Sequence, residues 1–327
     1  MYLFETTKDH LALARAEIAN LLLPPVEEEG NLFLANVHEP KFISRLAYTS
    51  VAYTVLARCA SFQLKETLAT IPWDTLCHPS YGVRSKTVLV NEKEVARHIW
   101  STLNDPVVNL HHPETWIVFF AFKGDILICK HVWNNPKNFL QRRAHLRPAP
   151  HPSSLDPRLA RACINISGLK RGVLLDPFCG SGGILIEAGK MRLRTGGFDL
   201  DELMLKRARK NLDHYGVTNT VLTQCDAIDA KNYDFHIDAI VTDVPYGKAS
   251  SLHARTKDEL YEKFLATIAT VKCLRFCILF PSDFGTEKIE QYFRIIETFS
   301  FPLHKSLSKT IYLLEKIERV EKKRIKK

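Results

Sequence analysis

The sequence predicts an α/β protein with a doubly wound, Rossmann-like sheet in its C-terminal half and a smaller α+β module in its N-terminal half. From residue 173 onward, short apolar runs alternate with stretches of helical periodicity, which is typical of a parallel sheet covered by helices. A glycine-rich turn follows the first of these runs. Ligands of such sheets bind at the carboxyl ends of the strands, so we expect the functional site there.

Composition narrows the class of protein. The 327 residues are 46% hydrophobic and 25% charged, and no apolar run approaches the roughly 18 residues that cross a bilayer. The N-terminus lacks the pattern of a secretory signal, so we expect a cytoplasmic protein with no membrane association. The eight cysteines are dispersed, which predicts reduced thiols and no metal site. The net charge of +9 favours a polyanionic partner.

The N-terminal half mixes helical and strand patterns. Helices are expected at 11–22, 42–56 and 95–103, and strands at 87–90 and 116–120. Three prolines between Arg147 and Ser154 disfavour regular structure and mark the main boundary. The predicted organisation is an N-terminal region at 1–145, a linker at 146–160, a catalytic domain at 161–317 and a basic tail at 318–327.

The C-terminal half is more regular. Strands are expected at 173–175, 197–198, 221–223, 239–241 and 276–280, with helices at 184–191, 202–215 and 260–271. Two further runs, at 295–299 and 310–314, follow in quick succession, and this spacing predicts an antiparallel edge of the sheet.

The turn after the first strand reads Asp-Pro-Phe-Cys-Gly-Ser-Gly-Gly from residue 176. Its glycines allow a ligand to touch the main chain, but Leu185 stands where a dinucleotide fingerprint needs a third glycine. Asp176, Asp199 and Asp226 follow successive strands and could face a sulfonium, a ribose and an adenine of S-adenosyl-L-methionine. The simpler interpretation is that such aspartates only cap the helices that follow.

A second motif, Asp243-Val-Pro-Tyr-Gly, follows the fourth strand. The exocyclic amine of a nucleobase has a lone pair that is delocalised into the ring, so its methylation requires the amine to be held. Asp243 and the Val244 carbonyl can supply two hydrogen-bond acceptors for such an amine. Pro245 stiffens the turn, and Tyr246 offers a face on which a base can stack. Taken alone, these residues are more typical of an ordinary turn.

Both motifs resemble those of class I methyltransferases, and the stretch from His151 to Arg161 is similar to the archaeal-type tRNA guanine-10 N2-methyltransferases. That resemblance implies a ferredoxin-like segment and a THUMP RNA-binding region in the N-terminal half, S-adenosyl-L-methionine as methyl donor and tRNA as substrate. It implies a catalytic group of Asp243, Val244, Pro245 and Tyr246. It implies a donor pocket made by His151, Ser153, Asp176, Pro177, Phe178, Gly180, Ser181, Gly182, Asp199, Leu200, Asp226 and Ala227.

One residue departs from this family. The family usually has proline where this chain has Val244, which restores a backbone donor while keeping the carbonyl acceptor. We expect activity to persist, and the sequence leaves open whether one or two methyl groups are added.

Basic residues are the remaining candidates. Contacts to RNA phosphates are expected from Arg84, Lys86, Arg142, Arg143 and Arg147. Each is equally typical of a solvated surface. Two other functions compete with tRNA guanine methylation. One is amino-methylation of another nucleic acid, such as ribosomal RNA or adenine N6 of DNA, and the other is a catalytically silent RNA-binding subunit. A small protein partner is also compatible with the sequence.

Overall fold

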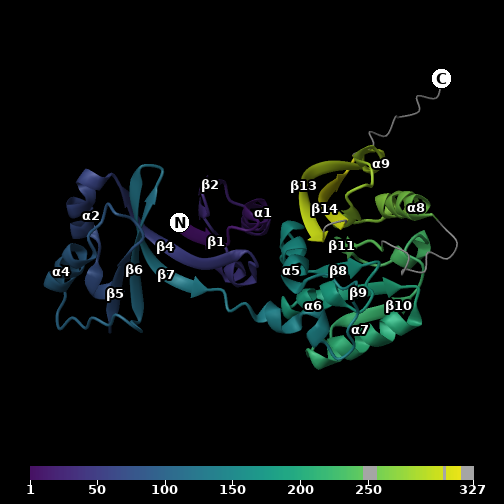
Figure 1. Ribbon diagram of the computed structural model, residues 1–327, viewed down its shortest axis with the longest axis horizontal. Coiled ribbons are helices and arrows are strands. Elements are labelled where there is room, and N and C mark those ends of the chain that lie inside the picture. The colour runs from purple at the N-terminus through teal and green to yellow at the C-terminus, as the bar shows by residue number, and fades with distance from the viewer. Residues whose placement is uncertain (246–255, 305–306, 318–327) are drawn as a thin grey trace, which may run out of the picture. The chain divides into compact units, whose positions relative to one another are not determined.

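The computed structural model describes residues 1–245, 256–304 and 307–317, and the chain forms two compact units, residues 1–136 and 137–327 (Figure 1). Within the described residues, each unit contains a seven-stranded sheet. The predicted fold class is confirmed: an α+β unit precedes a doubly wound one. The predicted basic tail at 318–327 lies outside the described residues. No helix in the described part of the chain is long and apolar enough to cross a membrane.

The sheet of the first unit has the order β2-β3-β1-β4-β7-β6-β5, in which only β5 and β6 pair in parallel. Its strands are β1 (Tyr2–Thr6), β2 (Val26–Glu29), β3 (Leu32–Ala35), β4 (Thr49–Cys59), β5 (Tyr81–Ser85), β6 (Thr115–Phe122) and β7 (Asp125–Asn134). Its helices are α1 (Leu11–Leu22), α2 (Leu64–Thr70), α3 (Trp73–Leu76) and α4 (Glu92–Thr102). The predicted helices at 11–22 and 95–103 and the strand at 116–120 are confirmed.

Two predicted elements of this unit are wrong. The expected helix at 42–56 is a short 3₁₀ helix, Pro40–Arg45, followed by β4, which lies between β1 and β7 in the sheet. Pairing on both sides therefore outweighs the helical spacing of its apolar residues. The expected strand at 87–90 is a turn in which Val88 is fully exposed, and the strand lies earlier, at β5.

The boundary between the units follows Pro136, earlier than the predicted boundary at residue 145. The proline-rich segment is part of the second unit, because Ala149 and the Asn211 side chain exchange two hydrogen bonds of 2.9 and 3.0 Å. The predicted linker also contains the start of helix α5 (Pro157–Ile166), which Asp156 caps by accepting from two backbone N–H groups. Proline at the first helical position after a capping aspartate is a helix-start signal that the sequence prediction overlooked.

The second sheet has the order β10-β9-β8-β11-β12-β14-β13, with parallel pairing from β10 to β12 and antiparallel pairing of β14. Its strands are β8 (Val173–Asp176), β9 (Arg194–Asp199), β10 (Thr220–Gln224), β11 (Ala239–Asp243), β12 (Arg275–Pro281), β13 (Phe293–His304) and β14 (Leu307–Lys316). All the strands predicted in this half and the antiparallel edge are confirmed.

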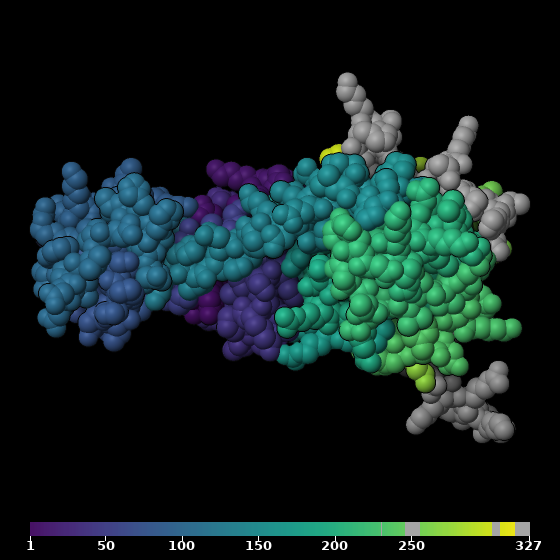
Figure 2. Space-filling model, turned by 90° about the horizontal axis from the view of Figure 1, so that it is seen from below, coloured from purple at the N-terminus to yellow at the C-terminus, as the bar shows by residue number. Residues whose placement is uncertain are grey.

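Helices cover both faces of this sheet (Figure 1). Besides α5, they are α6 (Gly183–Lys190), α7 (Glu202–His214), α8 (Lys257–Thr270) and α9 (Thr286–Glu290). The predicted helices at 184–191, 202–215 and 260–271 are confirmed. Helices α5, α6 and α7 lie on one face, and α8 and α9 share a core with β8, β11 and β12 on the other. Figure 2 shows the second unit from the side on which α7 lies.

Candidate active site

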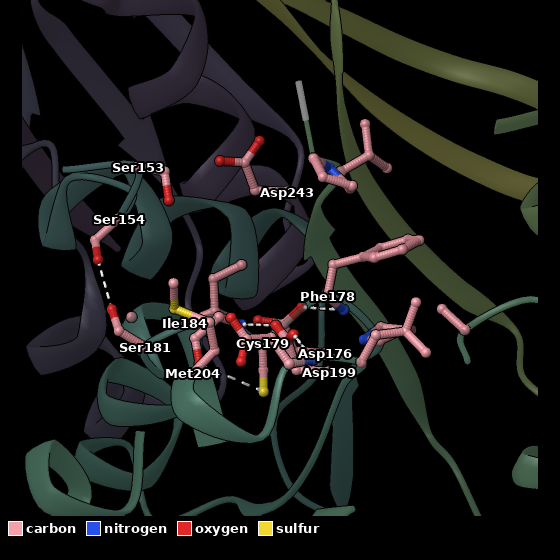
Figure 3. Close-up of a pocket in the computed structure, with 18 of the residues that line it drawn as sticks. Ser153, Ser154, Asp176, Phe178, Cys179, Ser181, Ile184, Asp199, Met204 and Asp243 are labelled. Carbon is pink, nitrogen blue, oxygen red and sulfur yellow. Dashed lines mark hydrogen bonds between the residues drawn. The ribbon is translucent and has the colours of Figure 1, made fainter. Parts of the chain in front are cut away.

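The carboxyl ends of β8, β9, β10 and β11 surround a cavity of about 210 Å³ in the second unit (Figure 3). Most of the residues proposed from the sequence line it together. They are His151, Ser153, Asp176, Pro177, Phe178, Gly180, Ser181, Asp199, Leu200, Asp226, Ala227, Asp243, Val244 and Pro245. The two motifs, which are far apart in the chain, therefore share one hollow. Tyr246 lies outside the described residues.

The glycine turn after β8 adopts a backbone that side chains disfavour. Gly180 and Gly182 have φ values of +49° and +86°, both in the left-handed region. Gly180 lines the cavity, but Gly182 is not among the lining residues. A Cβ on Gly182 would lie 3.3 Å from the Ala208 Cβ on α7, so this glycine permits close packing at the start of α6. Its contact with the methyl donor stays a prediction.

The three aspartates at the strand ends make similar local hydrogen bonds and lie at one cavity. Each accepts a hydrogen bond from the backbone N–H two residues further on, at 3.2 Å for Asp176, 2.9 Å for Asp199 and 3.1 Å for Asp226. These are local turns and not helix caps, because the N-cap residues of the helices that follow are Gly182, Asp201 and Asp229, so the capping interpretation is wrong. All three also line the cavity. Asp199 in addition accepts from the Gly180 N–H at 2.9 Å, which fixes the glycine turn against β9.

Burial shapes the protonation of these acids. Burial raises the pKa of Asp176 to about 7, while hydrogen bonds from Thr242 and the Phe178 N–H oppose the rise. The Thr242 hydroxyl on β11 donates to Asp176 Oδ1 at 2.6 Å and so links the two motif strands. Burial also raises the pKa of Asp199. A cavity with two such carboxyls favours a ligand that brings positive charge.

Asp243, at the end of β11, is held differently. Lys309 Nζ on β14 donates to Asp243 Oδ1 at 2.6 Å and contacts the other carboxylate oxygen as well. Burial raises the pKa of Asp243, and the Lys309 ammonium opposes that rise. Sequence reasoning did not identify Lys309. The one available signal was a lysine shortly before the apolar run 311–314.

Val244 and Pro245, the other described residues of the second motif, are fixed through their backbone. The Val244 N–H donates to the Leu279 carbonyl on β12 at 3.2 Å, and the Tyr261 hydroxyl on α8 donates to the Pro245 carbonyl at 2.6 Å. Val244 is fully buried. The residue that departs from the family pattern therefore extends the pairing of β11 with β12, which proline could not do.

Several lining residues were not predicted. The Ser154 hydroxyl hydrogen-bonds to the Ser181 hydroxyl at 2.7 Å, next to the pair of His151 Nδ1 and Ser153 Oγ at 2.6 Å (Figure 3). Burial lowers the pKa of His151. The remaining lining residues are Leu155, Cys179, Gly183, Ile184, Asp201, Met204, Cys225 and Leu260. Cys179 and Gly183 belong to the glycine-rich motif and Leu155 to the stretch 151–161, although none of them was proposed as a site residue. No motif marks the other five, because they belong to the site only through the packing of helix starts and strand ends.

Two of the predicted RNA contacts are buried. Arg142 forms a bidentate pair with Glu187 at 2.6 and 2.8 Å, and Arg147 Nε donates to the Arg142 carbonyl at 2.9 Å. Both arginines are buried, so their expected roles as phosphate contacts are corrected to structural ones. Arg143, between them, is exposed.

The two candidates in the first unit are partly exposed. Arg84 stacks on the Trp116 ring at 4.7 Å, and Lys86 pairs with Glu5. They stay predictions as phosphate contacts.

The strand order, the glycine turn and the shared cavity define a class I methyltransferase. A family model described as "RMKL-like, methyltransferase domain" matches residues 144–304. The chain is 34% identical to the tRNA (guanine(10)-N2)-dimethyltransferase of Methanothermobacter thermautotrophicus, with 84% of each chain covered. It is 34% identical to the enzyme of that name from Pyrococcus abyssi, with 75% of this chain and 77% of that one covered. The chain belongs to the tRNA (guanine(10)-N2)-dimethyltransferase family.

Two further similarities were found. The solved structure of TrmN from Thermus thermophilus is 20% identical, covers 97% of this chain and 99% of its own, and has a TM-score of 0.49. A model described as "DNA methylase" matches residues 76–210. That match ends before β11, so it does not include the motif that would hold the methyl acceptor.

Proposed function

We propose that this methyltransferase transfers a methyl group from S-adenosyl-L-methionine to the exocyclic N2 of a guanine in tRNA, with position 10 as the target. The observation that carries the proposal is that the glycine turn and Asp243–Pro245 line one cavity. The names of the relatives supply the nucleotide. A methyl donor and a base could therefore meet within bonding distance.

The cavity residues fit the donor. The carboxylate of Asp199 suits ribose hydroxyls, and Asp226 suits an adenine amine. Ile184, Met204 and Leu260 supply apolar contacts for a purine ring. Asp176 is a buried acid whose ionised form is unfavourable, and a nearby positive charge would stabilise it. The donor supplies an electrophilic methyl carbon on a sulfonium.

The second motif fits the acceptor. Asp243 and the Val244 carbonyl can accept hydrogen bonds from the two N–H groups of a guanine N2. In the transfer, the bond from sulfur to the methyl carbon breaks, a bond from N2 to that carbon forms, and N2 loses one proton. Holding the two reactants in line can contribute about 7–11 kcal/mol in favourable cases. Stacking of the base on Tyr246 stays a prediction from the sequence.

The first unit is proposed to bind the tRNA. Its α+β sheet is compatible with the THUMP region that the family resemblance implies. Arg84 and Lys86 are its candidate contacts.

Nucleoside mass spectrometry after reaction with purified protein and donor tests the proposal. Separate pools of tRNA, ribosomal RNA and DNA identify the substrate, and a tRNA transcript with adenine in place of G10 identifies the position. We expect N2-methylated guanosine in tRNA alone, absent from the altered transcript, and the mass gives the number of methyl groups. Asp243→Ala should abolish product while donor binding by calorimetry persists. Product only in DNA, or no donor binding, would refute the proposal.

A further inference from the structure

The antiparallel last strand brings a lysine to the catalytic edge of the sheet. Parallel strands such as β11 and β12 end at this edge, but β14 runs the opposite way and begins there. Lys309 is the third residue of β14 and pairs with Pro281 at the end of β12. Its side chain therefore spans the end of β12 to reach Asp243, which lies two strands away.

The contact is buried and charged. The Lys309 side chain is 1% exposed and the Asp243 side chain 11% exposed. A lysine buried to this degree is costly unless an acid and further hydrogen bonds compensate it. A neutral residue of similar volume would fill the same space without that cost. Packing alone therefore does not explain a lysine at this position.

We propose that Lys309 is a positioning residue that keeps the carboxylate of Asp243 ionised and oriented toward the methyl-accepting amine. The inference rests on the role of Asp243 in the proposed function. An amine that donates two hydrogen bonds needs acceptors, and a protonated Asp243 would present a donor to it instead. Because the Lys309 ammonium compensates the negative charge of Asp243, it also reduces the attraction between Asp243 and a sulfonium. Asp176 is then the acid that faces the donor.

Few other ionisable groups act on Asp243. Among the described residues, Asp176 on β8 and Tyr261 on α8 interact electrostatically with it, and Lys309 on β14 is its charged hydrogen-bond partner. Asp176 titrates in the neutral range and is expected to act on donor binding. Measuring turnover at saturating donor separates the titration of Asp243 from that of Asp176.

The test is the pH profile of kcat for Lys309→Met, with tRNA and donor both saturating. Without the ammonium, the ionised form of Asp243 is less stable, so the acid limb should move up by about one pH unit or more. On the acid limb, turnover should fall roughly tenfold for each unit of that shift, and it should recover to the wild-type value at higher pH. Lys309→Arg, which keeps the charge, should retain the wild-type profile shape.

Lys316→Met is the matched control, because Lys316 lies on the same strand and donates to the Val271 carbonyl instead. It should leave the profile unchanged. Melting temperature and donor affinity establish that each variant is folded, and Lys309→Gln replaces Lys309→Met if the latter does not fold. If Lys309→Met has the wild-type pH profile of kcat while Asp243→Asn is inactive, the inference about Lys309 is overturned and the proposed function is not. Full activity of Asp243→Asn would also overturn the inference, because a neutral acceptor would then suffice. Full activity of Asp243→Ala would overturn the proposed role of Asp243 and the inference with it.

Discussion

Asp176 and Asp243 show how one site gives two buried acids different properties. Both lie at the ends of neighbouring strands, and burial raises the pKa of each. Asp176 is compensated by the neutral Thr242 hydroxyl and a backbone N–H, whereas Asp243 is compensated by an ammonium. Differences of this kind assign separate roles to neighbouring carboxyls. We therefore expect Asp243 to accept hydrogen bonds and Asp176 to ionise when a cation binds.

The pKa of Asp176, about 7, predicts that donor affinity depends on pH. Because this pKa lies above the ordinary value for aspartate, Asp176 contributes most to the stability of the ligand-free folded protein at low pH. That contribution to stability is lost as the pH rises through 7. A bound sulfonium favours the ionised form. The affinity for S-adenosyl-L-methionine should therefore rise about five- to tenfold from pH 6 to pH 8.

Calorimetry with two ligands checks this prediction. S-adenosylhomocysteine has no sulfonium charge, so its affinity should change less over the same pH range. Titration of His151 and Asp199 should change the affinity for both ligands equally, so the difference between the two ligands reports on Asp176. Asp176→Asn keeps an acceptor for Thr242 and should flatten the difference between the ligands. Parallel curves for both ligands in the wild type would mean that Asp176 does not face the sulfur.

At the scale of elements, the end of β11 differs from the pattern of the family. The Val244 N–H donates to the Leu279 carbonyl, and Val244→Pro would leave that buried carbonyl without its donor. An unpaired buried polar group costs about 1–3 kcal/mol, partly offset by the stiffer proline backbone. We expect the free energy of unfolding to fall by about 1–2 kcal/mol in denaturant titrations. Turnover should persist, since the Val244 carbonyl acceptor is kept. Unchanged stability would show that this bond contributes nothing.

The 3₁₀ helix that carries Arg142 is attached to α6 by a buried ion pair. Glu187 is fully buried, and Arg161 Nη1 also lies 3.4 Å from Glu187 Oε2. Arg142→Met should therefore leave the charge of Glu187 only partly compensated. Breaking such a pair typically costs about 3–5 kcal/mol, and Arg161 reduces the expected loss to about 3 kcal/mol. Denaturant unfolding measures it. Adding Glu187→Met should restore most of the stability, because a neutral pair avoids the uncompensated charge. A double variant as unstable as the single one would contradict this account.

The elements also show which features the sequence could predict. The strands of the second unit and the two aspartate motifs were predictable, because apolar runs and strand-end residues are local signals. The helix expected at 42–56 was not, since only pairing with β1 and β7 makes that segment a strand. Lys309 and Tyr261 were missed for a related reason. Each reaches the second motif across the sheet or from a helix, and no spacing in the sequence encodes such a contact.

At the scale of the whole molecule, the positive charge is unevenly divided between the two units. Residues 1–136 contain 12 Lys and Arg against 14 Asp and Glu, whereas residues 137–327 contain 33 against 22. Attraction to phosphates depends on local excess of positive charge. The catalytic unit is therefore expected to supply most of the electrostatic affinity for tRNA, and the first unit is expected to contribute through shape and a few specific contacts.

Arg143 tests this division, because it is exposed in the catalytic unit next to the buried Arg142. Arg143→Ala should weaken tRNA binding at low salt and reduce the slope of log K against log salt by about one, as expected for one lost phosphate contact. Its melting temperature should not change. Arg84→Ala is the comparison in the first unit, where the guanidinium stacks on Trp116, and it should change the slope less. A larger effect from Arg84 would place the main phosphate-binding surface in residues 1–136, against the distribution of charge.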